Sequence, residues 1–100
     1  MIKTDLNKNV LVIGLGSIGN RHIQNLVELN FKNIFVFRQK SSENLIINNQ
    51  KIKVLSSWKD LEGMKIYTSI ICSPTSMHVD QLIKLINLGS HVLVEKPLFN

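Results

Sequence analysis

The fold of this chain is decided by the stretch Val10-Leu11-Val12-Ile13-Gly14-Leu15-Gly16-Ser17-Ile18-Gly19. A short, wholly apolar run rich in β-branched residues ends abruptly in three glycines spaced as GxGxxG. Such a run suits a strand buried on both faces of a parallel sheet. A helical pattern follows at once and ends near Asn30, and residues 33–37 are again strand-like. The segment predicts strand, turn, helix and strand, which is a βαβ unit.

The middle of the chain predicts shorter elements. Ser41 to Leu45 could open a short helix, Asn48-Asn49 indicates a turn, and residues 52–55 suit a third strand at the sheet edge. A helical turn capped by Ser57 is expected to reach Leu61, with Gly63 ending it.

The pattern of strands and helices becomes regular again towards the carboxyl end. Residues 67–72 predict a fourth strand and residues 91–95 a fifth. Between them we expect a helix capped by Thr75 or Ser76 and closed by Gly89, with an apolar face of Val79, Leu82, Ile83 and Ile86. Alternating strands and helices predict an α/β fold, a doubly wound parallel sheet with the strand order 3-2-1-4-5.

Composition limits the classes of function. The chain has 100 residues, 44% of them hydrophobic, which suits one folded domain. Its net charge of +5 comes from scattered Lys and Arg residues, so we expect a basic surface without a nucleic-acid partner. The single cysteine, Cys72, excludes an internal disulfide and a cysteine-based zinc site, and no metal is expected. No apolar run has signal-peptide or membrane-span length, so no membrane partner and a cytoplasmic location are expected.

The three glycines predict a site for a dinucleotide. Gly14 allows a sharp turn off the strand, Gly16 leaves room for a pyrophosphate, and Gly19 lets the helix pack closely. The helix start offers free N–H groups and a partial positive charge to the phosphates. The alternative is a glycine-rich turn that only packs tightly. We expect cofactor contacts from Gly14, Leu15, Gly16, Ser17, Ile18 and Gly19.

The end of the second strand bears on the choice between NAD and NADP. An acidic residue about twenty positions past the glycines usually binds the ribose 2′-hydroxyl of NAD. Arg38 holds that place here, and its guanidinium could bind a 2′-phosphate with two hydrogen bonds. The sequence therefore favours NADP over NAD, although a basic residue after a strand is often only solvated.

Residues 10–100 resemble the N-terminal domain of the GFO/IDH/MocA oxidoreductases, the family of glucose–fructose oxidoreductase and inositol dehydrogenase. Three stretches carry the likeness: residues 14–22, with the glycines and His22; residues 72–78, Cys-Ser-Pro-Thr-Ser-Met-His; and residues 95–97, Glu-Lys-Pro. Many enzymes have the first stretch. The second and third, spaced one helix and one strand apart, make the resemblance specific.

The resemblance implies further site residues. Residues Cys72, Ser73, Pro74 and Thr75 would form a loop against the cofactor's ribose and nicotinamide, with His78 opening the next helix nearby. Glu95, Lys96 and Pro97 would bring the Lys96 ammonium beside the nicotinamide and the substrate's reacting oxygen. A lysine there can stabilise a developing oxyanion or relay a proton, so Lys96 is the expected catalytic residue. His22, in contrast, is expected to be a helix-surface residue.

The family resemblance implies a domain and an activity as well. We expect residues 1–100 to be a truncated NAD(P)-binding Rossmann domain, with a substrate domain absent from this chain. The full-length protein would be a dehydrogenase acting on a sugar, cyclitol or sugar nucleotide, and a homo-oligomer, while the fragment would be inactive. The alternatives are a dinucleotide-sensing regulatory module without catalysis and, less favoured by the glycine turn, a methyltransferase-type nucleotide binder.

Overall fold

The buried apolar run and the glycines after it produce the first strand and helix as expected. The computed structural model describes residues 6–14, 17–38, 45–47, 49–73 and 77–95. Strand β1 (Asn9–Ile13) leads to helix α1 (Ser17–Glu28), and β2 (Asn33–Phe37) follows. Asn30 adopts a left-handed conformation, with φ of 69°, just after the helix ends. The predicted βαβ unit is confirmed, because β1 and β2 pair in parallel from Asn9–Asn33 to Ile13–Phe37.

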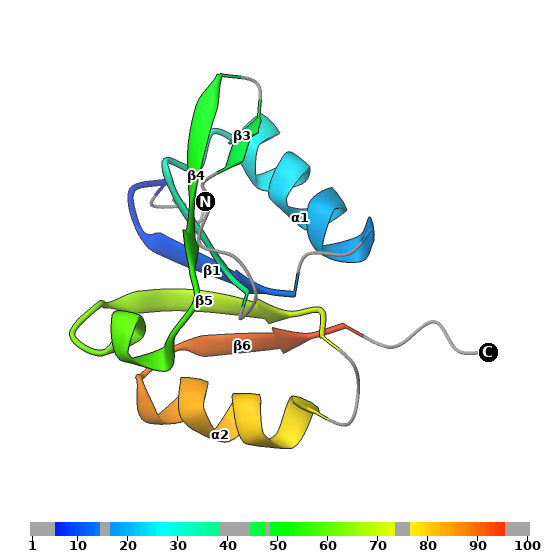
Figure 1. Ribbon diagram of the computed structural model, residues 1–100. Helices are drawn as coiled ribbons and strands as arrows, with labels where there is room; N and C mark the ends of the chain where they lie inside the picture. Colours follow the sequence, from blue (N-terminus) through cyan, green and yellow to red (C-terminus); the bar gives the residue numbers. More distant parts are fainter. Residues whose placement is uncertain (1–5, 15–16, 39–44, 48, 74–76, 96–100) are drawn as a thin grey trace, which may run out of the picture.

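The strands form one sheet with the order β3-β4-β2-β1-β5-β6 (Figure 1). The remaining strands are β3 (Leu45–Ile47), β4 (Gln50–Leu55), β5 (Ile66–Ile71) and β6 (His91–Val94). Strands β4, β2, β1, β5 and β6 run parallel to one another. The predicted doubly wound sheet is confirmed, and its order 3-2-1-4-5 holds for these five strands. The order reverses direction between β1 and β5, where such sheets bind ligands at the carboxyl ends of the strands.

Strand β3 is the main departure from the expected elements. It pairs antiparallel with β4 through a turn at Asn49, whose φ is 66°. The expectation of a short helix reaching Leu45 is therefore wrong at that residue, and residues 41–44 lie outside the described part. Residues 52–55 are not at the sheet edge, because β3 covers the outer side of β4. A three-residue apolar run favours a strand when a neighbouring edge can satisfy its backbone hydrogen bonds.

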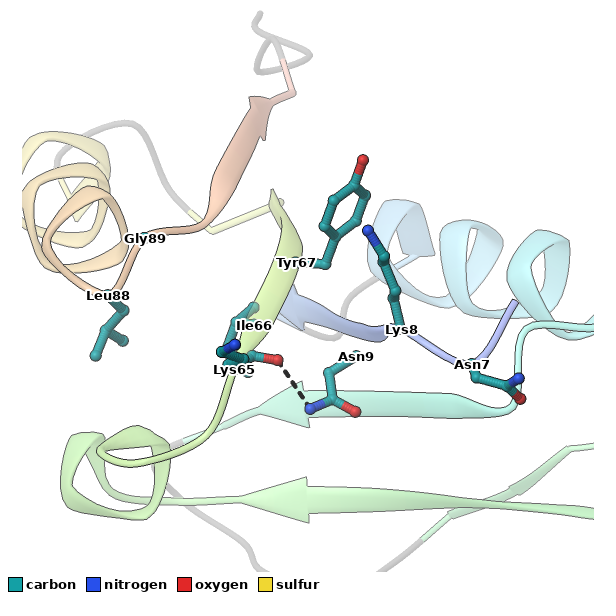
Figure 2. A pocket seen from close by; sticks show the side chains of 8 residues that line it. All are labelled: Asn7, Lys8, Asn9, Lys65, Ile66, Tyr67, Leu88 and Gly89. Atoms are coloured by element: carbon teal, nitrogen blue, oxygen red, sulfur yellow. Dashed lines mark hydrogen bonds between the residues drawn. The ribbon is translucent and has the colours of Figure 1, made fainter. Parts of the chain in front are cut away.

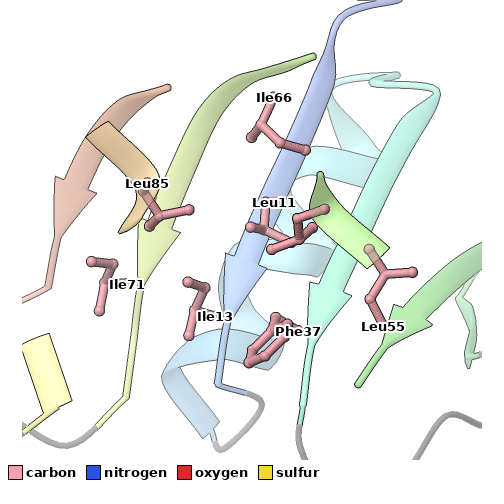
Figure 3. Close-up of a cluster of buried hydrophobic side chains, with 8 residues drawn as sticks. Leu11, Ile13, Phe37, Leu55, Ile66, Ile71 and Leu85 are labelled. Carbon is pink, nitrogen blue, oxygen red and sulfur yellow. The ribbon is translucent and has the colours of Figure 1, made fainter. Parts of the chain in front are cut away.

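Side chains alternate between two apolar layers on the two faces of the sheet. On one face, Leu11 and Ile13 pack with Leu85 of α2 (His78–Asn87) and with Leu61 (Figure 3). On the other face, Val12 packs against Ile23 and Val27 of α1. Helix α1 thus covers one face, and α2 covers the other together with the short 3-10 helix η1 (Trp58–Leu61). No described helix is long and apolar enough to span a membrane.

The helical turn η1 (Trp58–Leu61) also forms as expected. The Ser57 hydroxyl accepts a hydrogen bond from the Lys59 N–H at 3.2 Å, which caps the turn. Gly63 follows with a φ of 85°, a conformation that favours glycine. The turn places the fully buried Leu61 over the sheet.

Helix α2 turns a different face to the sheet from the one its sequence predicts. Its buried residues are Gln81 and Leu85, and Leu82 is half-buried. The rest of the predicted apolar face is exposed: Val79 by 67%, Ile83 by 54% and Ile86 by 57%. Apolar residues occur on two sides of this helix. The side that packs on the sheet also contains the polar Gln81, so the sequence pattern does not single it out.

The ends of α2 agree with the sequence only in part. Gly89 has a φ of 82° and closes the helix as predicted. Met77 occupies the cap position and makes no side-chain cap hydrogen bond, so the helix starts later than expected. Thr75 and Ser76, the predicted caps, lie outside the described residues.

Candidate functional site

The turn after β1 requires a glycine at its first position. Gly14 has a φ of 89°, and its N–H donates to the Phe37 carbonyl at 3.2 Å. A Cβ on Gly14 would lie 3.1 Å from the backbone nitrogen of Ser73. The chain leaving β5 therefore presses against the turn at the point where the strand order reverses. A side chain at position 14 would both strain the backbone and fill this close approach.

Gly19 fixes how closely α1 approaches the same turn. It is buried in the helix, and a Cβ there would lie only 2.3 Å from the carbonyl oxygen of Gly14. Glycine at this position therefore lets the start of α1 sit directly against the end of β1. Helix N–H groups at such a start have no partner within the helix, so they are available to an anion. Ile18 is half-buried beside Gly19.

Part of the predicted glycine site lies outside the described residues. Leu15 and Gly16 are not described, and neither is the side chain of Ser17, although Ser17 begins α1. The described residues thus define the two ends of the turn, at Gly14 and at Gly19. The structure brings these two predicted site residues together.

A second predicted segment, after β5, meets the glycine turn. The Cys72 N–H donates to the Ile13 carbonyl at 2.8 Å, which continues the sheet pairing to the end of β1. The Nε2 atom of His78 lies 2.6 Å from the Ser73 carbonyl oxygen. A carbonyl only accepts, so this nitrogen carries the proton. The Ser73 hydroxyl donates to the side-chain oxygen of the buried Gln81.

The two contacts of Ser73 hold the chain after β5 to the first turns of α2. His78 and Ser73, both predicted site residues, are thereby in contact. Gln81 was not predicted to belong to the site, and only its position one turn after His78 could have suggested it. Pro74 and Thr75 lie outside the described residues.

The thiol of Cys72 has low reactivity as a nucleophile in this position. Burial, and next the negative charge of Glu95, raise the pKa of Cys72 from 9.0 to about 11. The thiol therefore stays protonated at neutral pH and is a poor nucleophile.

Glu95 joins the third predicted segment to the first helix. Its N–H donates to the Ile71 carbonyl at 3.0 Å, and its carboxylate lies 2.9 Å from Nε2 of His22. A carboxylate accepts, so the imidazole donates. Sequence reasoning placed Glu95 in the site and His22 on the helix surface, and it missed their contact. The available signal was that the first matching stretch contains a basic residue, His22, and the third an acidic one, Glu95. Lys96 and Pro97 lie outside the described residues.

Arg38 lies where the sequence places it, at the carboxyl end of β2. Its N–H donates to the Leu55 carbonyl at 2.8 Å, and the residue is half-buried. It thus follows β2 directly, on the side of β1 away from β5. Residues 39–44, which hold the other candidate donors of this loop, are outside the described part.

A hollow of about 570 Å³ lies at the other end of the strands, away from the glycine turn (Figure 2). It lies at the amino ends of β1 and β5, where Asn9 donates to the Lys65 carbonyl at 2.8 Å. The Lys8 ammonium there lies 3.8 Å from the centre of the Tyr67 ring. Its lining residues are Asn7, Lys8, Asn9, Lys65, Ile66, Tyr67, Leu88 and Gly89. The hollow shares no residue with the glycine turn. We therefore place the candidate dinucleotide site at the carboxyl ends of the strands and not in this hollow.

Charged and metal-binding side chains are sparse around the candidate site. Among the described residues, no group of three or more His, Cys, Asp or Glu side chains could hold a metal ion. The described polar groups nearest the turn are the helix start, the Ser73 segment and the His22–Glu95 pair. Such an arrangement can bind a phosphate-bearing ligand along α1 and present polar groups to its far end.

Comparison with known proteins identifies relatives that contain this domain. A sequence profile of an oxidoreductase family with an NAD-binding Rossmann fold, GFO/IDH/MocA, matches residues 8–100. Myo-inositol 2-dehydrogenase from Thermotoga maritima is 30% identical over 91 residues, which are 87% of this chain and 27% of that protein. The 4-carboxy-2-hydroxymuconate-6-semialdehyde dehydrogenase of a Sphingobium strain is 29% identical over 93 residues, 89% of this chain and 30% of that protein. The chain thus spans less than a third of the length of these relatives.

Solved structures share the fold. Myo-inositol 2-dehydrogenase from Lactobacillus plantarum superimposes with a TM-score of 0.69 at 26% identity, over 92% of this chain and 29% of that one. A Rex-family repressor, RSP, in complex with NADH superimposes with a TM-score of 0.62 at 20% identity, over 94% of this chain and 49% of that one. At that identity the second likeness shows the fold alone.

Proposed function

The chain belongs to the GFO/IDH/MocA oxidoreductase family, and from this premise we propose that it is the NAD(P)-binding part of a dehydrogenase. The full-length protein would transfer a hydride to or from a hydroxyl-bearing carbon of a sugar, cyclitol or sugar nucleotide. The observation that supports the proposal is the close packing at Gly14 and Gly19, where a Cβ would meet backbone atoms and which sets the start of α1 directly against the end of β1. Two dehydrogenase relatives, one named for myo-inositol, support the reaction class.

The residues at this turn suit a dinucleotide. The pyrophosphate would lie at the start of α1, where backbone N–H groups and the helix dipole favour negative charge. Gly14, Ile18 and Gly19, together with Leu15, Gly16 and Ser17, would line it. Ser73 and Cys72, with Pro74, Thr75 and His78, would face the ribose and nicotinamide at the end of β5. The bound nicotinamide supplies the carbon that accepts or delivers the hydride.

Lys96 is the proposed catalytic residue. It follows Glu95, whose backbone pairs with β5 and whose carboxylate contacts α1. An ammonium at this place would stabilise negative charge on the substrate oxygen or move its proton while the hydride is transferred. Glu95 and Pro97 would hold that segment in place. We further propose that the substrate pocket is supplied by another domain of the full-length protein.

A preference for NADP over NAD is proposed on the basis of Arg38. The guanidinium follows β2 directly and replaces the carboxylate that would bind a ribose 2′-hydroxyl. In Arg38→Asp, NADPH affinity should fall by about tenfold or more while NADH affinity is retained or rises, because the 2′-phosphate loses a charge-assisted partner.

Titration with NADH and NADPH, followed by nicotinamide fluorescence, tests these proposals. Binding of either one supports the dinucleotide site, and the absence of binding by both refutes it. A clear preference for NADH would refute the role of Arg38. In the full-length protein, Lys96→Ala should abolish turnover and retain cofactor binding. Full-length wild-type protein that binds cofactor and never oxidises or reduces any polyol would instead support a regulatory, dinucleotide-sensing function.

A further inference from the structure

We propose that His22 is a positioning residue, which holds the segment bearing Lys96 against the helix that binds the cofactor. The inference rests on the proposed function, in which Lys96 acts beside the nicotinamide. It concerns the contact between the His22 imidazole and the Glu95 carboxylate. These two residues are 73 positions apart in the sequence and 2.9 Å apart in the structure.

The contact is a directed one between partly shielded groups. The His22 side chain is 23% exposed and that of Glu95 is 35% exposed. The Nε2–H of the ring points at a single carboxylate oxygen, and a hydrogen bond to an ionised acceptor is among the stronger kinds. It links α1 to the residue that follows β6, because His22 lies on that helix and Glu95 comes directly after Val94.

Among the described strands, β6 is paired on one side only, with β5. It thus lies at the edge of the described sheet, and its Leu93 and Val94 side chains are 51% and 38% exposed. Within the described residues, the backbone bond from the Glu95 N–H to the Ile71 carbonyl is the last one that ties this strand to β5. The contact of the Glu95 side chain with His22 is a second attachment, and it fixes the orientation of Glu95, the residue that precedes Lys96 in the sequence.

The position of His22 on α1 connects the contact with the proposed cofactor site. His22 lies three residues after Gly19, on the helix whose start forms the proposed pyrophosphate site. The Glu95 N–H donates to the carbonyl of Ile71, the last residue of β5, so Glu95 lies at the end of that strand. The pair thus crosses the end of β5 and joins the phosphate end of the site to the segment proposed for chemistry. The contact would therefore fix the position of Lys96 relative to the cofactor.

Stability alone is a weak reason for this pair. Partly exposed ion pairs contribute only about 0–1 kcal/mol to folding, so the domain should remain folded without it. Misplacing a reacting group by about 1 Å, in contrast, can lower a rate by roughly a hundredfold. Loss of the contact should therefore affect kcat much more than stability or cofactor affinity.

The test uses the full-length protein, with any polyol it oxidises, and compares variants of His22 and Glu95 with the wild type. His22→Ala should lower kcat by about tenfold to a hundredfold. The Kd for the preferred reduced cofactor, measured by fluorescence, should change by less than about threefold. His22→Gln should recover at least part of the lost kcat, because its amide can still donate to the carboxylate. Glu95→Gln combined with His22→Ala should be no slower than the slower single variant.

Gln24→Ala is the matched control, since Gln24 is an exposed residue of the same helix. It should have the wild-type kcat, and all variants should unfold at similar temperatures. The proposal is overturned if His22→Ala has the wild-type kcat, or if His22→Gln is as slow as His22→Ala, which would indicate direct acid–base chemistry by the imidazole. It is also overturned if cofactor affinity falls in parallel with kcat.

The same assay separates this proposal from the one on which it rests. If Lys96→Ala retains full turnover, the proposed catalytic role of Lys96 fails, whatever the His22 variants do. If Lys96→Ala is inactive and His22→Ala is fully active, only the positioning role fails.

Discussion

Replacing Gly19 by alanine tests the close approach of α1 to the glycine turn. Alanine in a helix interior is ordinarily favoured over glycine by about 0.5–1 kcal/mol. Here, however, the new Cβ would lie 2.3 Å from the Gly14 carbonyl oxygen, and real Cβ atoms essentially never come within 3.0 Å of such atoms. Because the obstructing atom is backbone, it cannot rotate away, and the helix or the turn must move by at least 0.7 Å.

The expected magnitude follows from these two opposing effects. Forcing an extra carbon into a packed site costs about 1–3 kcal/mol, which outweighs the helix preference. We therefore expect Gly19→Ala to lower the free energy of unfolding by about 1–2 kcal/mol. Displacement of the helix start should also remove about one hydrogen bond to the pyrophosphate, or roughly tenfold in the Kd for the dinucleotide.

Urea unfolding and fluorescence titration with NADH and NADPH measure the two effects. The control is Asn20→Ala, at the next position of the same helix, where the side chain is exposed. It should change stability by less than about 0.5 kcal/mol and leave affinity unaltered. If Gly19→Ala is at least as stable as the parent and binds with unchanged affinity, the turn yields freely and the reasoning is refuted.

Three further perturbations test the packing, a cap and a titration. Leu85→Ala should lower the free energy of unfolding by about 2–5 kcal/mol in urea, while Ile83→Ala should change it by less than about 0.5 kcal/mol, because only Leu85 is buried. Ser57→Ala should cost about 1 kcal/mol by removing the cap of η1, as followed by thermal unfolding. Stability should fall as the pH rises from 9 to about 11, because Cys72 ionises first in the unfolded chain, and Cys72→Ala should reduce that dependence.

Each of these has an outcome that would contradict it. Equal losses for Leu85→Ala and Ile83→Ala would mean that both sides of α2 pack equally. An unchanged melting temperature for Ser57→Ala would mean that the hydroxyl contributes nothing to the turn. Rapid alkylation of Cys72 at pH 8, at the rate of an unhindered thiol, would mean that burial does not hold its pKa high.

Local patterns determined the parts of the fold whose signals lie within a few residues. The β-branched run, the three glycines and the helical spacing after them specify β1, the turn and α1, because each sets the backbone conformation of its own segment. Alternation of strands and helices then led to the parallel order of five strands, since connections are short and cross over with one hand. Gly14, Gly19, Ser73 and Glu95 were found as site candidates from motifs and from the family resemblance.

Tertiary packing decided what depends on distant neighbours. Strand β3 exists because β4 offers it an edge, and no signal within residues 45–47 alone names that partner. Helix α2 carries apolar side chains on two sides, and only contact with the sheet selected the side of Leu85. The His22–Glu95 contact joins groups 73 residues apart, and it forms only because the parallel strands bring the ends of β1, β5 and β6 to one edge. Such contacts depend on the closure of the whole sheet, which local sequence does not encode.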